Sequence, residues 1–304
     1  MYFLKRLAFI IPLLLVISLL AFVLVRLAPG GPFDRERKAA SEEIERHLQA
    51  KYHLDEPVWR QYLRYLGGLA RGDLGPSLKY RNHTVNDIVA QALPVSMVLG
   101  GLAFLFALGV GMPLGVIAAW WRQRWLGSAA NLAMMLVVCV PALLLGPALV
   151  MLFAIHWRWF PVGGWESPWH AVLPVVTLGL FFSGRVARLM REGMLNTLGL
   201  PFIQMARAKG LSDVAVVLKH AFPIAVLPVV SYSGPLLADL LTGSFVVENV
   251  FQIPGIGIFM VNSSLNRDYP MIVGLVLLYA LLLILLNLGV DFLYALLDPR
   301  VRLK

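Results

Sequence analysis

The stretch QMARAKG at residues 204–210 is polar and basic, and a helix-prone run follows it as far as Pro223. It lies between two long apolar segments, residues 168–187 and 223–247, each of which is long enough for a membrane span. Gly210 is placed to end a first short helix, because glycine adopts the left-handed helix-stop conformation without a steric penalty. The sequence therefore predicts a basic helical hairpin between two spans, which we interpret as a docking element for a soluble partner.

The composition is that of an integral membrane protein. Of the 304 residues, 59% are hydrophobic and 14% are charged, whereas an ordinary soluble domain has roughly 25% charged residues. The single cysteine, Cys139, lies in an apolar run and excludes a disulfide framework. The net charge of +9 does not indicate nucleic-acid binding, because most basic residues lie at the ends of apolar segments and no RNA- or DNA-binding motif accompanies them.

Six apolar segments are long enough to cross a bilayer, which takes about 20 helical residues. They cover residues 7–27, 95–119, 132–155, 168–187, 223–247 and 271–297. The fourth is apolar only over residues 171–182, but Arg185 and Arg188 extend it because long basic side chains reach the interface. The first resembles a signal peptide but is too long and has no cleavage site. We therefore expect an all-α membrane protein with six transmembrane helices, in which residues 1–28 form an uncleaved anchor.

Lysine and arginine in the short connections predict the orientation of the spans. With the N-terminus in the cytoplasm, the short outer loops contain only Arg158 and Arg267. The cytoplasmic side then contains Lys5, Arg6, Arg122, Arg124, Arg191, Arg207, Lys209, Lys219, Arg300, Arg302 and Lys304. We therefore expect both termini in the cytoplasm and the long first loop outside.

Residues 29–93 form this first loop, which we expect to be a small external subdomain. Ser41, followed by two glutamates, is typical of a helix start. A second start is indicated at Asp55-Glu56-Pro57. The apolar residues that follow it at helical spacing are Trp59, Tyr62, Leu63 and Leu66. This stripe predicts that the second helix packs on the outer ends of the spans.

The second span carries a small residue at every fourth position. These residues are Ala103, Ala107, Gly111 and Gly115. Because small residues on one face let helix backbones approach closely in a membrane, we expect this face to be structural.

The fifth span is unusually polar and carries residues that break helices. They are Pro228, Ser231, Tyr232, Ser233, Gly234, Pro235, Asp239, Thr242, Gly243 and Ser244. Irregular backbone at membrane depth is tolerated where it is buried in protein or lines a wet cavity. We therefore expect this span to line a translocation path, with Ser231, Ser233, Asp239 and Thr242 as candidate lining residues. An acidic residue within a span is a functional candidate, although Asp239 could also be satisfied by a helix neighbour or a partner subunit.

Motifs for catalysis are absent from the sequence. There is no G-x-x-x-x-G-K-[ST] phosphate loop, no H-E-x-x-H and no G-x-S-x-G. The six histidines are scattered and not paired at the spacing of metal ligands. We therefore expect no catalytic residues, no cofactor and no metal in this chain.

The stretch from Gln204 onward resembles the cytoplasmic signature of ATP-binding-cassette (ABC) importer permeases. Ala206, Gly210 and Pro223 match that signature. It departs from the signature at Gln204, Met205, His220 and Phe222, where Glu, Ala, Ile and Leu would stand. The form ARAKG at residues 206–210 is typical of the peptide branch of the family.

Other blocks extend the resemblance over nearly the whole chain. They are LAPGGP at 27–32, AKYHL at 50–54, GDLGPS at 72–77, PGIG at 254–257, NRDY at 266–269 and DPR at 298–300. Together they are similar to the B-type membrane subunit of an oligopeptide permease. The resemblance implies a type I ABC importer permease fold with a transmembrane core at residues 94–293 and a cytoplasmic tail at 294–304.

The same resemblance implies the function and the partners. The chain would be the non-catalytic permease subunit of an ATP-driven oligopeptide uptake system in a bacterial inner membrane. It would form the translocation path with a second homologous permease, and it would work with two ATPase subunits and an external peptide-binding protein. The coupling residues carried over are Ala206, Arg207, Lys209, Gly210 and Leu211.

Other interpretations stay open at this point. A secondary transporter would require several intramembrane carboxylates or an inverted repeat, and only Asp239 fits. A membrane-bound enzyme would require a clustered nucleophile, base or metal set. The hairpin could also lie on lipid, but this would need a larger apolar face than Val214, Val217 and Leu218 provide.

Overall fold

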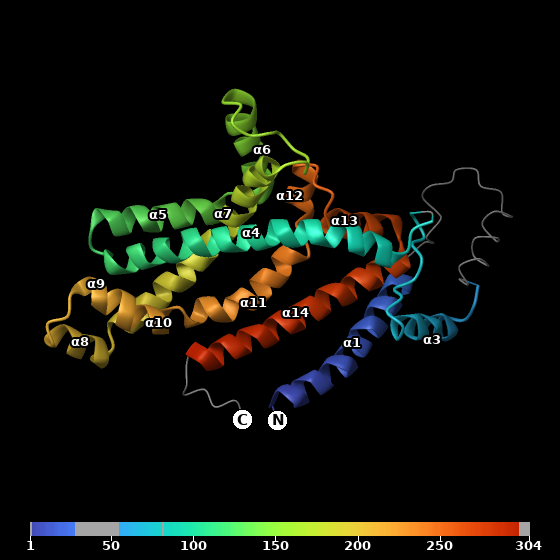
Figure 1. The fold of residues 1–304 in the computed structure, drawn as a ribbon, viewed down its shortest axis with the longest axis horizontal. Helices are drawn as coiled ribbons and strands as arrows, with labels where there is room; N and C mark the ends of the chain where they lie inside the picture. Colours follow the sequence, from blue (N-terminus) through green and yellow to red (C-terminus); the bar gives the residue numbers. More distant parts are fainter. Residues whose placement is uncertain (1, 28–54, 81, 298–304) are drawn as a thin grey trace. The chain divides into compact units, whose positions relative to one another are not determined.

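The structure is a computed structural model that describes residues 2–27, 55–80 and 82–297, with the side chains of 2–8 and 294–297 left out. Within these ranges the chain is helical (Figure 1), and the only β pairing is an isolated bridge between Pro76 and Thr84. The helices are α1 (Tyr2–Leu27), α3 (Val58–Leu69), α4 (Val85–Trp120), α5 (Trp125–Cys139), α6 (Ala142–Leu149), the π-helix η1 (Val150–His156), α7 (Pro168–Leu198), α8 (Pro201–Ala208), α9 (Asp213–Ala215), the π-helix η2 (Val216–Ala221), α10 (Phe222–Ala225), α11 (Leu227–Leu241), α12 (Phe245–Val250), α13 (Ile256–Asn266) and α14 (Tyr269–Leu297). The helix expected after Ser41 lies outside the described residues.

The expected all-α membrane fold is confirmed. Five spans long and apolar enough to cross a membrane occur in the described part of the chain. They are Phe9–Leu27, Val85–Trp120, Pro168–Leu198, Leu227–Val250 and Tyr269–Leu293. The count reaches six when the bent pair formed by α5 and α6–η1 is taken as one span.

The third span, expected at residues 132–155, is broken in the structure. The helices before and after the break differ in direction by 101°. Val140 is extended at the break, with φ −87° and ψ 114°, and Pro141 follows it. The ring of a proline disfavours helical backbone at the preceding residue, and its missing N–H removes a helix hydrogen bond. The predicted span at residues 132–155 therefore consists of two helices that meet at Pro141.

Close packing divides the chain into two units, and residues 95–254 with 285–304 make up the larger. Its core surrounds α7, in which Val186, Met190 and Met194 are fully buried. The small face of α4 packs against this helix, as the sequence predicted. A Cβ atom on Gly111 would lie 2.7 Å from the carbonyl oxygen of Ser183, so no larger residue fits there.

The smaller unit contains residues 1–94 with 255–284. Helix α3 starts after Pro57 as predicted and packs through Tyr62, Tyr65 and Leu69 on a cluster that includes Phe22 of α1 and Val273 of α14. The expected stripe is wrong in part, because Trp59 and Leu63 stay exposed at 59% and 57%. Helix α3 is therefore apolar on two sides, of which one is partly buried.

Candidate coupling segment and translocation path

The segment around Gly210 forms a tight helix–turn–helix in the structure. Helix α8 ends at Ala208, and Gly210 has a φ of +80°, the left-handed conformation that the sequence predicted. The N–H of Gly210 donates to the carbonyl of Arg207 at 2.9 Å, and the N–H of Leu211 donates to that of Ala206 at 3.4 Å. These two hydrogen bonds make a Schellman cap, which satisfies the last carbonyl groups of α8 and fixes the direction of the turn.

The second arm of the hairpin begins at Ser212. Its hydroxyl accepts a hydrogen bond from the N–H of Ala215 at 3.4 Å, which caps α9. Arg207 and Asp213 form an ion pair across the turn, with 3.6 Å between Nε and Oδ1. Because both side chains are about half exposed or more, the pair contributes little stability and leaves the charge of Arg207 accessible.

One side of the hairpin is rooted in the core of the chain. Ile203, Val216 and Ala221 are fully buried, and they belong to the same cluster as Met190 and Met194 of α7. At the base of the hairpin, Gly193 of α7 lies so close to the carbonyl of Ala225 in α10 that no Cβ would fit. The second arm is therefore packed directly against a membrane span.

Ala206 belongs to this buried side. The residue is 7% exposed and packs in the chain's own core, so its small size fits that packing. Its neighbours in α8 differ, since Met205 is 57% exposed. In an eight-residue helix the sequence alone did not show which of the two adjacent apolar residues turns inward.

The other side of the hairpin is exposed and combines apolar with basic residues. We call this surface the docking face; it consists of Met205, Arg207, Lys209, Leu211, Val214 and Leu218. Sequence reasoning missed Met205 and underestimated the apolar area, because Val217 turns inward while Met205 and Leu211 add to the surface. The apolar residues Met205 and Leu211 on either side of the turn were the feature of the sequence that could have indicated this larger apolar surface.

The candidate path residues of α11 do not all lie on one surface. Ser231 and Asp239, eight residues apart and so on one side of the helix, are both exposed in the chain, and each makes a contact of its own. Thr242 is 8% exposed, and its hydroxyl donates to the carbonyl of Ala238 at 2.9 Å. The Ser233 hydroxyl donates to the carbonyl of Val229 at 2.8 Å. The expected break is present, because α11 ends at Leu241 and α12 starts at Phe245.

A buried carboxylate that sequence reasoning missed anchors this broken span. Glu248 of α12 is fully buried, and the hydroxyl of Ser96 in α4 donates to its Oε1 at 2.7 Å. The two residues are 152 positions apart in the sequence. An acidic residue in the apolar run FVVENV was a signal, but its partner was not predictable from local pattern. The pair ties α12 to the second span.

Asp268 has a similar anchoring role in the smaller unit. It is fully buried and accepts hydrogen bonds from the Ser77 hydroxyl, from the N–H of Leu78 at 3.1 Å and from that of Met271 at 3.4 Å. Asp268 thus caps the start of α14 and holds the loop that contains Ser77 and Leu78. Ser77 and Asp268 come from two of the sequence blocks that carried the resemblance, so their contact gives those blocks a structural reason.

Within the described residues, no three His, Cys, Asp or Glu side chains are placed to hold a metal ion.

Known proteins match this chain over most of its length. A family model described as binding-protein-dependent transport system inner membrane component matches residues 111–303. The oligopeptide transport system permease protein OppB of Haemophilus influenzae is 44% identical over 301 residues, 98% of each chain. That of Escherichia coli K12 is 43% identical over 304 residues, 99% of each chain. The dipeptide transport system permease protein DppB of Bacillus subtilis is 41% identical over 302 residues, 99% of this chain and 98% of that one.

A solved structure resembles the chain in fold. The inward-facing MetNI methionine ABC transporter aligns with a TM-score of 0.52 at 14% identity, covering 69% of this chain and 96% of that chain. The spans and this likeness define a multi-pass membrane protein with the type I ABC importer permease fold. The chain belongs to the family of binding-protein-dependent transport system inner membrane components. It is a non-catalytic permease subunit, and such a system includes a binding protein, a partner permease and an ATPase.

Proposed function

We propose that the chain is the permease subunit of an ATP-driven oligopeptide uptake system in a bacterial inner membrane. Support comes from the relatives named oligopeptide and dipeptide permeases, which cover nearly the whole chain. In this proposal a second homologous permease completes the translocation path, two ATPase subunits bind on the cytoplasmic side, and an external peptide-binding protein delivers the substrate. Both termini of the chain lie in the cytoplasm.

The hairpin at residues 204–223 couples the ATPases to the spans in this proposal. The observation that carries it is the Schellman-capped turn, which presents an exposed apolar and basic surface on a buried base. When ATP closes the ATPase dimer, a rigid element moves as a body, whereas a flexible loop would absorb the displacement. Contact of Gly193 with Ala225 would pass that movement directly to α7.

The two halves of the docking face have separate roles in this mechanism. Met205, Leu211 and Leu218 supply apolar area that a groove on the ATPase removes from water. Arg207 and Lys209 steer the association and set its orientation through charge. Ala206 and Gly210 act on the shape of the hairpin, the first by packing inward and the second by its backbone conformation.

The translocation path is proposed to include the exposed side of α11. Ser231 and Asp239 present polar groups there, and a partner permease facing them would enclose a wet cavity. Ser233 and Thr242 contribute mainly by bonding to helix carbonyls, which keeps the polar span intact near its break. The same four residues are the path residues expected from the sequence.

Substitution of the docking face tests the coupling role. We expect Met205→Asp and Leu218→Asp to lower co-purification of the ATPases by at least about ten-fold, since each puts a charge into a desolvated contact. Trp125→Asp serves as the matched control, because Trp125 is 76% exposed and lies outside the docking face. Peptide affinity of the external binding protein should be unchanged in all three.

The alternative that the hairpin lies on lipid makes the opposite prediction. The exposed apolar surface of the hairpin is larger than the sequence suggested, so both ATPase docking and lipid contact are compatible with its size. If the two variants keep the ATPases at the wild-type ratio, the surface does not dock to them and the coupling role is refuted.

A further inference from the structure

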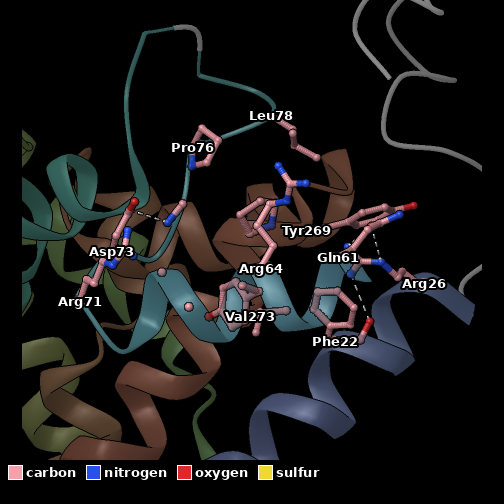
Figure 2. Close-up of a pocket in the computed structure, with 15 residues that line it drawn as sticks. Phe22, Arg26, Gln61, Arg64, Arg71, Asp73, Pro76, Leu78, Tyr269 and Val273 are labelled. Atoms are coloured by element: carbon pink, nitrogen blue, oxygen red, sulfur yellow. Dashed lines mark hydrogen bonds between the residues drawn. The ribbon is translucent and has the colours of Figure 1, made fainter. Parts of the chain in front are cut away.

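A cavity of about 490 Å³ lies in the smaller unit, where the end of α1 meets α3, the start of α14 and the loop at residues 71–78 (Figure 2). Its lining is apolar on one side, with Phe22 and Val273, and cationic on the other. The cationic residues are Arg26, Arg64 and Arg71, whose side chains are distributed along the cavity in Figure 2, and the carboxylate of Asp73 also belongs to the lining. No function assigned above uses this cavity.

The positive charge of the cavity is only partly compensated. Arg64 pairs with Glu56 at 2.6 Å. Arg26 donates to the neutral amide oxygen of Gln61 at 2.7 and 3.2 Å, and its guanidinium lies 3.5 Å from the centre of the Phe22 ring, so no described carboxylate neutralises it. Arg71 forms no ion pair within the described ranges, although the Asp73 carboxylate lies beside it in Figure 2 and offsets part of its charge. The cavity therefore has the charge to hold an anion.

A buried hydroxyl in the lining has no hydrogen-bond partner. The Oη of Tyr65 is enclosed and unpaired in the described structure. Burial, with a smaller effect from Tyr62, raises the pKa of Tyr65, so the hydroxyl stays protonated and keeps a proton to donate. Leaving a buried donor unsatisfied costs free energy, and a ligand acceptor would recover it once the Tyr65 side chain shifts to bring its hydroxyl to the cavity surface.

The position along α1 indicates where this cavity meets the bilayer. The apolar span Phe9–Leu27 has 19 residues, and at about 1.5 Å per residue it covers about 28 Å, close to the thickness of the hydrocarbon core. Arg26 in its last turn therefore lies at the level of the lipid headgroups. Leu24 and Leu27 beside it are 64% and 73% exposed, as lipid-facing residues are.

Helix α3 has the features of an interfacial helix. Trp59 and Leu63, one turn apart, form an exposed apolar strip, and Arg60 stacks on Trp59 at 5.1 Å. A helix with an apolar face and basic residues lies in the plane of the interface, where tryptophan is enriched. The cavity thus opens among residues suited to the boundary between water and lipid.

We propose that this cavity binds an anionic phospholipid by its phosphate. The phosphate oxygens accept hydrogen bonds from Arg26, and the positive charge of Arg71 at the other end of α3 adds to the attraction of the anion. The glycerol and the first acyl carbons lie along Phe22 and Val273. A phosphatidylglycerol headgroup fits better than a zwitterionic one, because an ammonium group would be repelled by the arginines. The apolar wall favours a lipid over free phosphate.

Native mass spectrometry of the purified, delipidated permease complex tests this assignment. Phosphatidylglycerol, phosphatidylcholine and inorganic phosphate are titrated separately. We expect one tight phosphatidylglycerol site in the wild type. Affinity should fall about ten-fold for Arg26→Gln, which removes a charge-assisted hydrogen bond, and a few-fold for Arg71→Gln, which removes a positive charge from the lining. Tyr65→Phe should weaken binding by a few-fold, and Arg60→Gln, on α3 but outside the cavity, should leave it unchanged.

Three results would overturn the proposal. The first is equal lipid retention by the wild type and Arg71→Gln. Because Arg71 is exposed, this variant should assemble normally and can test the proposal even if Arg26→Gln fails to assemble. Equal affinity for phosphatidylcholine, or displacement of the lipid by inorganic phosphate at equal concentration, would remove the headgroup specificity. If the arginine variants bound lipid like the wild type but no longer bound the external binding protein, the cavity would be a protein-docking site instead.

Discussion

Replacing Gly210 with valine should uncouple transport from ATP while leaving the spans in place. Gly210 has a φ of +80°, and a Cβ at this position would meet no atom within 4 Å. Steric crowding is therefore excluded as the cause of any defect, and the cost is that of the backbone conformation alone. A left-handed conformation costs roughly 1–2 kcal/mol for an ordinary residue and up to about 3 kcal/mol for a strained one.

This cost converts directly to docking affinity. If the chain relieves about 2 kcal/mol by leaving the Schellman geometry, the arm after the turn changes direction and the affinity for the ATPase falls by up to about 30-fold. Gly210→Ala should show a smaller loss, and Gly210→Asn the smallest, because asparagine tolerates the left-handed region.

The assay combines ATPase co-purification with uptake of a labelled peptide. Gly199→Val is the matched control, since this glycine also has open space around its Cβ position but has a φ of −83°, which any residue adopts. Normal uptake and normal ATPase retention in Gly210→Val would refute the role of the hairpin. Loss of the protein from the membrane would show instead that the segment serves folding.

Three further changes have defined outcomes. Ala206→Asp places an unpaired carboxylate in the core at a cost of at least about 3 kcal/mol, so we expect inserted spans with a protease-sensitive hairpin; a protease-resistant hairpin would contradict its buried position. Asp239→Asn should preserve assembly, whereas Asp239→Leu should lower peptide uptake, and unchanged uptake in the leucine variant would make the residue structural only. Reporter tags after Lys304 and within residues 121–128 should be cytoplasmic and one near Lys79 external, and an external C-terminal tag would invert the predicted orientation.

The features that the sequence predicted well depend on local chemistry. The left-handed turn at Gly210 and the start of α3 after Pro57 follow from rules that concern a few neighbouring residues. The buried face of α4 follows from a single period, since Gly111 and the small residues aligned with it leave room for a neighbouring backbone. Apolar length alone identified the spans.

The features that it missed depend on tertiary contacts or on an unused local rule. Ser77 meets Asp268 across 191 positions, and no local pattern pairs them. Ala206 and Met205 are adjacent apolar residues in a short helix. Packing against the core around α7 decides that Ala206 is the one that turns inward. The break at Pro141 was readable from the preceding residue, but apolarity over residues 132–155 outweighed it.

ATP-driven uptake in proteoliposomes tests the proposed function most directly. The chain is reconstituted with its partner permease and ATPases, a labelled oligopeptide and the binding protein are added outside, and ATP is enclosed inside. We expect uptake that requires both the binding protein and ATP and that persists when ionophores collapse the proton and sodium gradients. Uptake that proceeds without ATP and stops with the ionophores would show a secondary transporter and contradict the proposal.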